Sequence, residues 1–288
     1  MNWISFLGIN LIAATVRETV SKKVVNHIDP LTAFFYFSLF ISVWLFIIHL
    51  IIYKEPPRIE PDVVLSGIVS LIGYASYLKA VSYSLSKSIL FQSYSVVVTI
   101  LLAAVFLGEA SLLNPAKTEG IKLIIGLLLA LFSLKFLMAT HSKKVEVQQK
   151  KWLFYILLTI LFMGLGSFFN VFFVRIMPIT SVFTNQALFM VPVSFLLLKL
   201  LRKNISLSRN NLSFLTVTSV AQAVAYVSFF KASEMVVVSR LFPIQQVALV
   251  ITTMICGFIF FKERELVNKH KIIGSILGII GIILIAGA

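Results

Sequence analysis

The sequence predicts an all-α integral membrane protein with ten transmembrane helices. Three observations lead to this prediction: the composition, the length and number of the apolar runs, and an internal repeat. Of the 288 residues, 59% are hydrophobic and only 12% are charged, and the mean hydropathy is +1.00. Soluble domains carry about twice that charged fraction. We therefore expect lipid, rather than water, to surround most of the protein.

Apolar runs of about 20 residues follow one another along the chain, separated by short connections that hold charge or proline. A helix rises about 1.5 Å per residue, so a run of this length crosses the hydrocarbon core of a bilayer. The first run lacks a basic N-terminal region and a small-residue cleavage site, which favours a retained helix over a signal peptide. The ten runs cover approximately residues 3–21, 33–53, 62–84, 87–107, 119–138, 152–174, 179–201, 212–233, 236–261 and 268–287.

The net charge of +14 does not indicate nucleic-acid binding in this chain. The basic residues lie mainly between the apolar runs, where Lys and Arg contact anionic headgroups and set the topology. We therefore predict membrane lipids and a small-molecule substrate as partners, and no nucleic acid. Cys256 is the only cysteine, so neither a disulfide within the chain nor a cysteine-based metal site is possible. The sequence leaves a homodimer open.

Short motifs recur in the same order in the two halves of the chain. Because each half holds five spans, an odd number, the second half must enter the membrane from the opposite side. This arrangement of inverted repeats is common in alternating-access carriers. The motif pairs, with offsets of 152, 154 and 148 residues, are Lys79-Ala80 with Lys231-Ala232, Leu107-Gly108-Glu109 with Phe261-Lys262-Glu263, and Pro30-Leu31-Thr32 with Pro178-Ile179-Thr180.

The predicted organisation is a first five-helix repeat at residues 1–140, a basic linker loop at residues 141–151 and a second five-helix repeat at residues 152–288. The motif Leu107-Gly108-Glu109 closes the fourth helix, the pattern Tyr77-x-Lys79-Ala80 ends the third, and the fifth helix of each half is rich in glycine. With these features the chain resembles the EamA-type members of the drug/metabolite transporter superfamily over essentially its whole length.

This resemblance implies a ten-helix bundle with a central cavity lined by the first four helices of each repeat. The fifth and tenth helices are then peripheral. It also implies a carrier for small polar or amphipathic solutes, located in a bacterial inner membrane. The orientation has two opposing indications. When each of the 25 Lys and Arg residues is assigned to its nearest connection, 18 belong to odd-numbered connections and 7 to even-numbered ones, which predicts both termini outside. The family resemblance implies both termini inside.

Polar side chains within the predicted spans are the candidates for a substrate site. They are costly in a bilayer and usually face a cavity or a partner helix. The alternative for each of them is an ordinary hydrogen bond between helices, worth about 1 kcal/mol or less. The residues that we predict to bind substrate are Arg17, Tyr74, Tyr77, Gln92, Asn170, Gln222, Tyr226, Gln245 and Gln246.

Arg17 and Glu18 are the most informative of the polar residues, because each costs about 2.5 to 3.5 kcal/mol near the centre of a bilayer. We predict that Arg17 presents its guanidinium to an anionic group of the substrate and that Glu18 is the candidate proton acceptor for coupling. Alternatively, both side chains extend to the nearby end of the helix. Trp152 stands at the edge of its run and is predicted to lie in the interfacial aromatic belt.

The leading hypothesis for function is secondary active transport of a small metabolite, amino acid or drug-like solute by alternating access, with proton coupling or exchange. A flippase for an amphipathic lipid-linked substrate is the alternative. An integral-membrane enzyme is disfavoured, because the sequence holds no H-E-x-x-H motif, no G-x-S-x-G motif and no paired intramembrane aspartates. We therefore predict no catalytic residue, no cofactor and no metal site.

Overall fold

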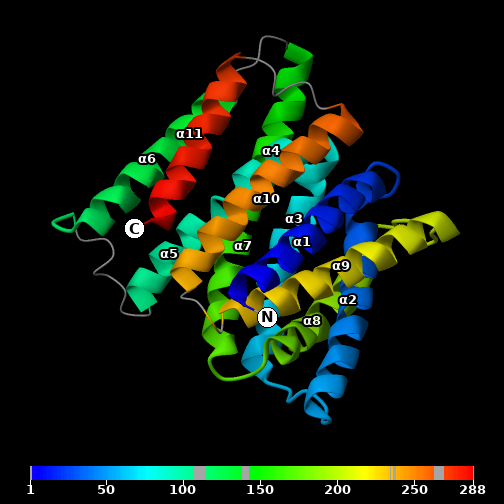
Figure 1. Cartoon of the computed structure of the whole chain (residues 1–288). Coiled ribbons are helices and arrows are strands. Elements are labelled where there is room, and N and C mark those ends of the chain that lie inside the picture. The colour runs from blue at the N-terminus through cyan, green and yellow to red at the C-terminus, as the bar shows by residue number, and fades with distance from the viewer. Residues whose placement is uncertain are drawn as a thin grey trace.

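The computed structural model describes residues 2–106, 115–137, 143–233, 235, 238–262 and 269–287, and within these ranges it consists of helices without a strand (Figure 1). The all-α part of the predicted fold class is therefore confirmed for these residues. The first half contains α1 (Trp3–Val25), α2 (Pro30–Tyr53), α3 (Pro61–Tyr83), α4 (Leu85–Gln92), α5 (Ser95–Phe106) and α6 (Thr118–Leu137). The second half contains α7 (Lys143–Val174), α8 (Ile179–Leu200), α9 (Arg209–Ser233), α10 (Val238–Phe261) and α11 (Lys269–Ala286).

Proline starts the matched second helices of the two halves. Helix α2 begins at Pro30, and its N-cap Asp29 accepts a hydrogen bond from the backbone N–H of Leu31 at 3.0 Å. Helix α8 begins directly after Pro178. Proline fits the first turn because the backbone N–H that it lacks would have no partner there.

The predicted fourth helix is interrupted. Instead of one helix over residues 87–107, the structure has α4 and α5, separated by a turn at Ser93 and Tyr94. The Ser93 hydroxyl donates to the Leu90 carbonyl at 2.5 Å, a local bond through which serine competes with the regular helix ladder. Apolar residues stand close to the turn on both sides, so the hydropathy pattern does not reveal the break.

Most of the predicted linker loop at residues 141–151 is helical, because α7 begins at Lys143 and runs for 32 residues. The segment 143–151 consists mostly of Lys, Glu and Gln, which favour a helix. A cluster of charge therefore ends an apolar run without ending the helix.

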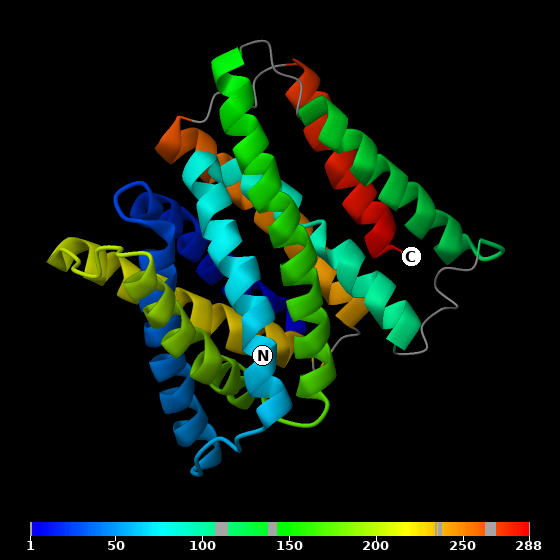
Figure 2. The same ribbon diagram turned by 180° about the vertical axis from the view of Figure 1, so that it is seen from behind.

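The two halves pack through reciprocal pairs of helices. Helix α1 lies along α9, and α7 of the second half lies along α3 of the first. Helix α2 packs on α8, and α6 lies along α11 with the opposite chain direction (Figure 1). Figure 2 shows α3 and α7 side by side. We count α4 and α5 as one helix and match the helices of the two halves in order. The contact of α1 with α9 then corresponds to that of α7 with α3, while the contacts of α2 with α8 and of α6 with α11 each correspond to themselves. This correspondence is expected of inverted repeats.

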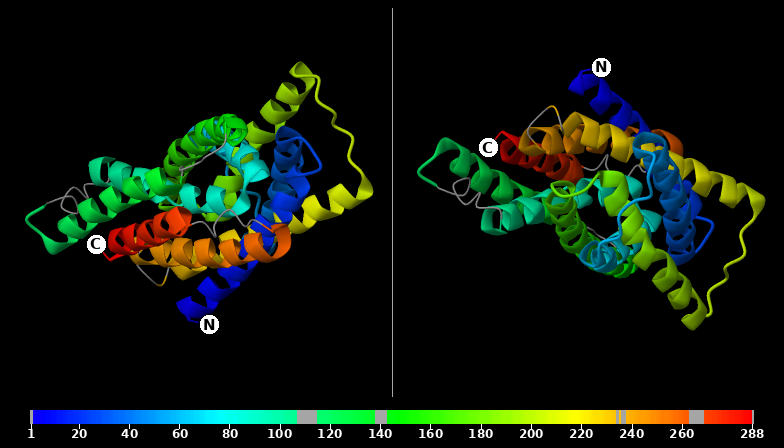
Figure 3. Two further views of the ribbon diagram at one scale, coloured as in Figure 1. Left: turned by 90° about the horizontal axis from the view of Figure 1, so that it is seen from above. Right: turned by 90° about the horizontal axis from the view of Figure 1, so that it is seen from below.

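Helices α6 and α11 form a pair at one end of the elongated cross-section, opposite the loop between α8 and α9 (Figure 3). This agrees with the peripheral position that the resemblance implies for the fifth and tenth helices. At Gly278 of α11, an added Cβ would lie 2.8 Å from the hydroxyl oxygen of Tyr94. The glycine therefore allows α11 to approach the turn between α4 and α5.

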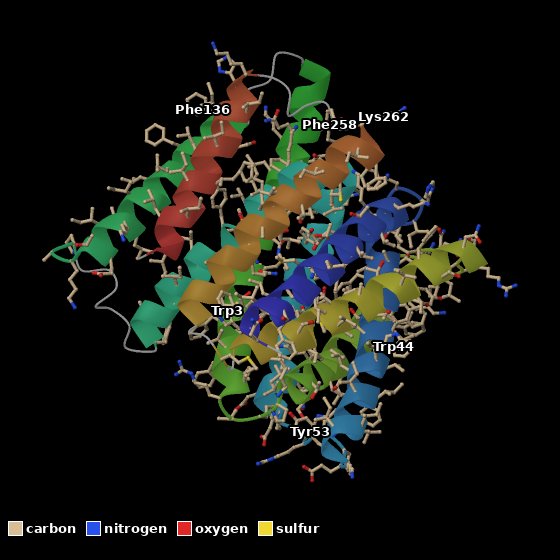
Figure 4. The ribbon with its side chains drawn as sticks, in the orientation of Figure 1. Trp3, Trp44, Tyr53, Phe136, Phe258 and Lys262 are labelled. Carbon is tan, nitrogen blue, oxygen red and sulfur yellow. The ribbon has the colours of Figure 1, made fainter. Side chains whose placement is uncertain are left out.

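The outer surface of the bundle is apolar. Ile12, Ile51 and Leu200 expose 70%, 71% and 69% of their surface, and Figure 4 shows Tyr53 and Phe258 on the outside of the helices. Exposed apolar surface of this extent indicates contact with lipid. Five helices, α2, α3, α7, α8 and α9, contain a span long and apolar enough to cross a bilayer. The protein is a multi-pass integral membrane protein, and the count of ten spans stays a prediction.

Glycine lets α3 approach the second half closely. A Cβ added at Gly67 would lie 2.5 Å from the carbonyl oxygen of Gln186 on α8, and one added at Gly73 would lie 3.0 Å from the backbone nitrogen of Met163 on α7. Both neighbours are backbone atoms, which cannot turn aside as a flexible side chain can. Small residues at such contacts are the usual means of close packing between membrane helices.

We predict that Gly67→Val destabilises the protein, because the added side chain forces α3 and α8 apart. The expected cost is about 1 to 3 kcal/mol, the usual range for overpacking. Thermal unfolding of the protein purified in detergent measures it, with a fall of several degrees in Tm. Gly8→Val is the matched control, because nothing lies within 4 Å of a Cβ added at Gly8. Equal Tm values for the two variants would contradict the packing argument.

Candidate functional site

A charged and polar cluster lies buried between α1, α3 and α9. Glu18 is fully buried and accepts a hydrogen bond from the hydroxyl of Tyr77, which is also fully buried. The guanidinium of Arg17 donates to Glu18 and to the side-chain oxygen of Gln222, and its side chain is 11% exposed. We call these four residues the Arg17 cluster. It joins the two halves, because α1 and α3 belong to the first and α9 to the second.

The helical spacing of α1 directs its polar residues toward α9. Asn10 and Arg17 are two turns apart and therefore lie on one face. The side-chain amide of Asn10 donates to the Ala225 carbonyl at 2.8 Å, while Arg17 donates to Gln222. Two polar contacts, two turns apart, thus hold one face of α1 against one face of α9.

Aromatic rings surround the Arg17 cluster. On α3, the ring of Tyr74 lies 5.8 Å from that of Tyr77, centroid to centroid, and stacks on Phe37 of α2 at 4.7 Å. On α9, Tyr226 stacks on Phe183 of α8 at 4.0 Å. These rings exclude water, so the charge interactions of the guanidinium are stronger there than in solution.

Several buried polar atoms of the described helices have no hydrogen-bond partner. A buried donor or acceptor without a partner costs about 1 to 3 kcal/mol, and native structures contain few of them. Two of them, Arg17 Nε and Gln222 Nε2, belong to the Arg17 cluster itself, which indicates a site that can receive a ligand. In the described part of the chain, the buried polar atoms without a partner are Asn10 Oδ1, Arg17 Nε, Ser38 Oγ, Tyr74 Oη, Gln92 Oε1, Gln222 Nε2 and Gln246 Oε1.

A narrow hollow adjoins the Arg17 cluster. It contains about 200 Å³ of empty space when its open mouth is included. The cluster itself is shielded from solvent, so the structure holds the polar centre closed. The hollow is lined by Ser21, Val24, Val25, Ala33, Phe37, Leu78, Leu215 and Thr218.

Asn170 lies in a different network, centred on Gln186 of α8. The amide nitrogen of Gln186 donates to Asn170 at 2.9 Å and to Ser66 at 3.1 Å, and its amide oxygen accepts from Ser70 at 3.3 Å. These bonds tie α3, α7 and α8 together and use both ends of the Gln186 amide. For Asn170, the structure favours an interhelical hydrogen bond over substrate binding.

The other predicted glutamines lie on α4 and α10, which pack on each other. Gln92 is 7% exposed, and Gln245 and Gln246 are each 9% exposed. Among the described residues, no hydrogen bond connects these three to the Arg17 cluster. The structure thus separates the predicted residues into the Arg17 cluster with Tyr74 and Tyr226, the glutamines of α4 and α10, and Asn170.

Lys22 is a buried residue of this region that sequence reasoning missed. It is 6% exposed, and its ammonium donates to the carbonyls of Val81 and Ser82 at 2.7 and 3.1 Å. A cation at the end of α3 complements the free carbonyls of that helix. The position of Lys22, one turn after Glu18, was the available signal that it shares the face of the buried carboxylate.

Trp152, which we predicted to lie in the interfacial belt, packs against the first half of the bundle. Its side chain is 5% exposed, its ring nitrogen donates to Ser88 at 3.0 Å, and its ring meets Phe91 edge to face at 5.1 Å. Because α7 starts at Lys143, Trp152 stands more than two turns inside the helix rather than at its edge.

An ion pair outside the spans joins the halves at one end of α2. The Asp29 carboxylate lies 2.9 Å from the ammonium of Lys203. Burial opposes ionisation of Asp29, but the hydrogen bonds from Lys203 and Leu31 outweigh it and lower the pKa of Asp29. The same hydrogen bond raises the pKa of Lys203. The pair therefore stays charged from about pH 5 to 9, and its stabilisation is lost only as the pH falls through the lowered pKa of Asp29 or rises through the raised pKa of Lys203.

The fold and the Arg17 cluster define a class of protein: a multi-pass helical membrane protein whose two halves enclose a buried, charged site. A model of the EamA-like transporter family matches the chain twice, over residues 1–139 and 150–287. The chain belongs to the EamA-like transporter family, as its motifs predicted. No curated protein matches the chain. The motif Leu107-Gly108-Glu109 and its counterpart Glu263 lie outside the described residues.

We predict that Tyr77→Phe destabilises the protein by about 1 to 3 kcal/mol, because the fully buried carboxylate of Glu18 loses a hydrogen-bond donor. Thermal unfolding in detergent tests this. Tyr53→Phe removes the same hydroxyl from an exposed position at the end of α2 and should leave Tm unchanged. A Tyr77→Phe variant as stable as the Tyr53→Phe control would show that the hydroxyl does not support the carboxylate.

Proposed function

We propose that this protein is a secondary active transporter that moves a small solute across the membrane by alternating access, with the Arg17 cluster in its substrate site. One observation carries this proposal: the cluster is buried and is shared by helices from both family-matched segments. Movement of one repeat against the other changes a contact that both repeats make. Binding at such a contact is therefore coupled to movement.

The guanidinium of Arg17 supports a solute with an anionic group, such as a metabolite, an amino acid or a drug-like acid. Its fork of N–H donors matches a carboxylate in two-point contact. In the closed structure, Glu18 supplies that carboxylate from within the protein. A solute carboxylate competes with Glu18 for the same donors, and the unpartnered Nε of Arg17 adds a further one.

Glu18 also supports coupling to protons. When its carboxylate takes up a proton, it no longer balances the charge of Arg17, and the guanidinium favours an anionic solute instead. A proton and an anion then occupy the site together. The Asp29–Lys203 pair keeps its charges near neutral pH and therefore does not account for such coupling.

The finer architecture is part of the same proposal. We place ten spans in two inverted repeats, residues 1–140 and 152–288, in a bacterial inner membrane. The excess of Lys and Arg in the odd-numbered connections supports an orientation with both termini outside. Membership in a family of transporters favours transport over catalysis.

We predict that Arg17→Ala lowers solute flux at least about tenfold, because a hydrogen bond to a charged group is worth about 1.5 to 3 kcal/mol. A thermal-shift screen of the purified protein against a metabolite panel supplies the solute, and uptake into proteoliposomes measures its flux. Arg58→Ala is the control, because that side chain is 83% exposed and pairs only with its neighbour Glu60 among the described residues.

The double variant Arg17→Ala with Glu18→Ala accompanies this test, since it leaves no unpaired charge buried in the cluster. Wild-type flux in a well-folded Arg17→Ala protein would contradict the proposed site. Scrambling of fluorescent phospholipid by the same liposomes, without solute flux, would favour the flippase.

We predict that Glu18→Gln abolishes proton-driven accumulation of the solute but not solute exchange. The neutral amide cannot take up a proton, so a pH gradient no longer drives accumulation of the solute, while exchange of labelled for unlabelled solute continues. Glu60→Gln, at the half-buried start of α3, is the control and should accumulate solute as the wild type does. Accumulation by Glu18→Gln that still follows the pH gradient would rule out Glu18 as the coupling group.

A further inference from the structure

Gln92 and Gln246 occupy equivalent positions in the two repeats. They are 154 residues apart, which is the offset between the motif that closes the fourth helix, ending at Glu109, and its counterpart, ending at Glu263. Gln92 is the last residue of α4, and Gln246 lies on α10. Helix α4 packs on α10, so each repeat contributes one glutamine to this pair of helices.

Both glutamines are more than nine-tenths buried, and the side-chain oxygen of each lacks a hydrogen-bond partner. Gln186 shows what a structural glutamine looks like in the same bundle. It is fully buried, and its amide binds Ser66, Ser70 and Asn170. Among the described residues, the amide oxygens of Gln92 and Gln246 form no comparable bond between helices, and a buried acceptor without a partner destabilises the fold.

The helix break next to Gln92 is a second, independent observation. The chain leaves the helical path at Ser93 and Tyr94, directly after this glutamine. Within a membrane, irregular backbone is tolerated where it is buried in protein or lines a cavity, and carriers place their substrate sites at such breaks.

Helix α1 connects this region with the Arg17 cluster. It contacts α4 and α10 as well as α9. Thr15, two residues before Arg17, shares a hydrogen bond of 2.9 Å with Thr252 of α10. The unused donors of Arg17 and Gln222 and the unused acceptors of the two glutamines therefore lie on helices that meet along α1.

We propose that Gln92 and Gln246 form a second subsite, in which their amide oxygens together accept hydrogen bonds from an ammonium or hydroxyl group of the solute. This inference rests on the proposed function, and it specifies a second chemical group of the solute. The solute then carries an anionic group for Arg17 and a donor group for the glutamine pair. A subsite with one residue from each repeat forms only when the repeats come together.

The first test compares one substitution at three positions. Gln92→Leu and Gln246→Leu remove amides whose oxygens have no partner, so the Tm of the empty protein should stay unchanged or rise. Gln186→Leu removes a fully bonded amide and leaves Ser66 and Asn170 without their partner, so its Tm should fall by several degrees. A fall at Gln92→Leu and Gln246→Leu as large as that at Gln186→Leu would make the pair structural and overturn the proposal.

The second test uses three probes with the same ring and carboxylate: 3-phenylpropanoate with no donor, L-phenylalanine with an ammonium, and 3-phenyllactate with a hydroxyl. Titration calorimetry of the full-length protein in detergent measures their affinities. We expect at least one donor-bearing probe to bind about tenfold or more tightly than 3-phenylpropanoate, which corresponds to one hydrogen bond. Tight binding of L-phenylalanine alone identifies an ammonium subsite, and tight binding of both donors identifies a hydroxyl-tolerant one.

In the double variant Gln92→Leu with Gln246→Leu, this preference should disappear while the affinity for 3-phenylpropanoate stays the same. A preference that survives the double variant would overturn the subsite. Equal binding of all three probes that is lost in Arg17→Ala would refute the subsite and leave the proposed function intact. No binding of any probe to the wild type would count against both proposals.

Discussion

The buried ion pair of Arg17 and Glu18 is the constraint on which the arrangement of the bundle depends. Charges inside a membrane protein are tolerated only when they are paired and hydrogen-bonded, because their desolvation is otherwise too costly. Helix α1 carries this pair and the buried Lys22, so it cannot present that face to lipid. Tyr77 of α3 and Gln222 of α9 supply the remaining partners. The charges thus select the neighbours of α1, and α9 brings the second repeat to the first.

The sequence predicts well the features that depend on local chemistry. The thickness of a bilayer sets the length of each single helix, and the missing N–H of proline sets where a helix starts. The predicted starts of the second helix of each half agree with α2 and α8 within a few residues. The same reasoning does not predict the turn at Ser93 or the early start of α7 at Lys143. Apolar residues stand close to the turn on both sides. At the linker, hydropathy falls while helix propensity stays high.

The candidate site is predictable in part for a similar reason. Helical spacing alone places Asn10 and Arg17 on one face of α1, and the structure confirms that they share it. Which helix meets that face is a tertiary matter that a single sequence does not reveal. Asn170 shows the consequence, because its partner Gln186 lies on a neighbouring helix and uses the amide for packing.

The reciprocal seams of the bundle are chemically unequal, and this inequality bears on how a two-repeat carrier can work. The seam of α1 with α9 is closed by the hydrogen bond from Arg17, which is paired with Glu18, to Gln222. The equivalent seam of α7 with α3 adjoins the neutral network of Asn170 and Gln186. A proton on Glu18, or an anion at Arg17, changes the charge at the seam of α1 with α9. Within the residues that the structure describes, the network of Asn170 and Gln186 contains no ionisable side chain that would respond in the same way. In the proposed cycle, the charged seam therefore responds to the solute, while the neutral seam holds the repeats in register.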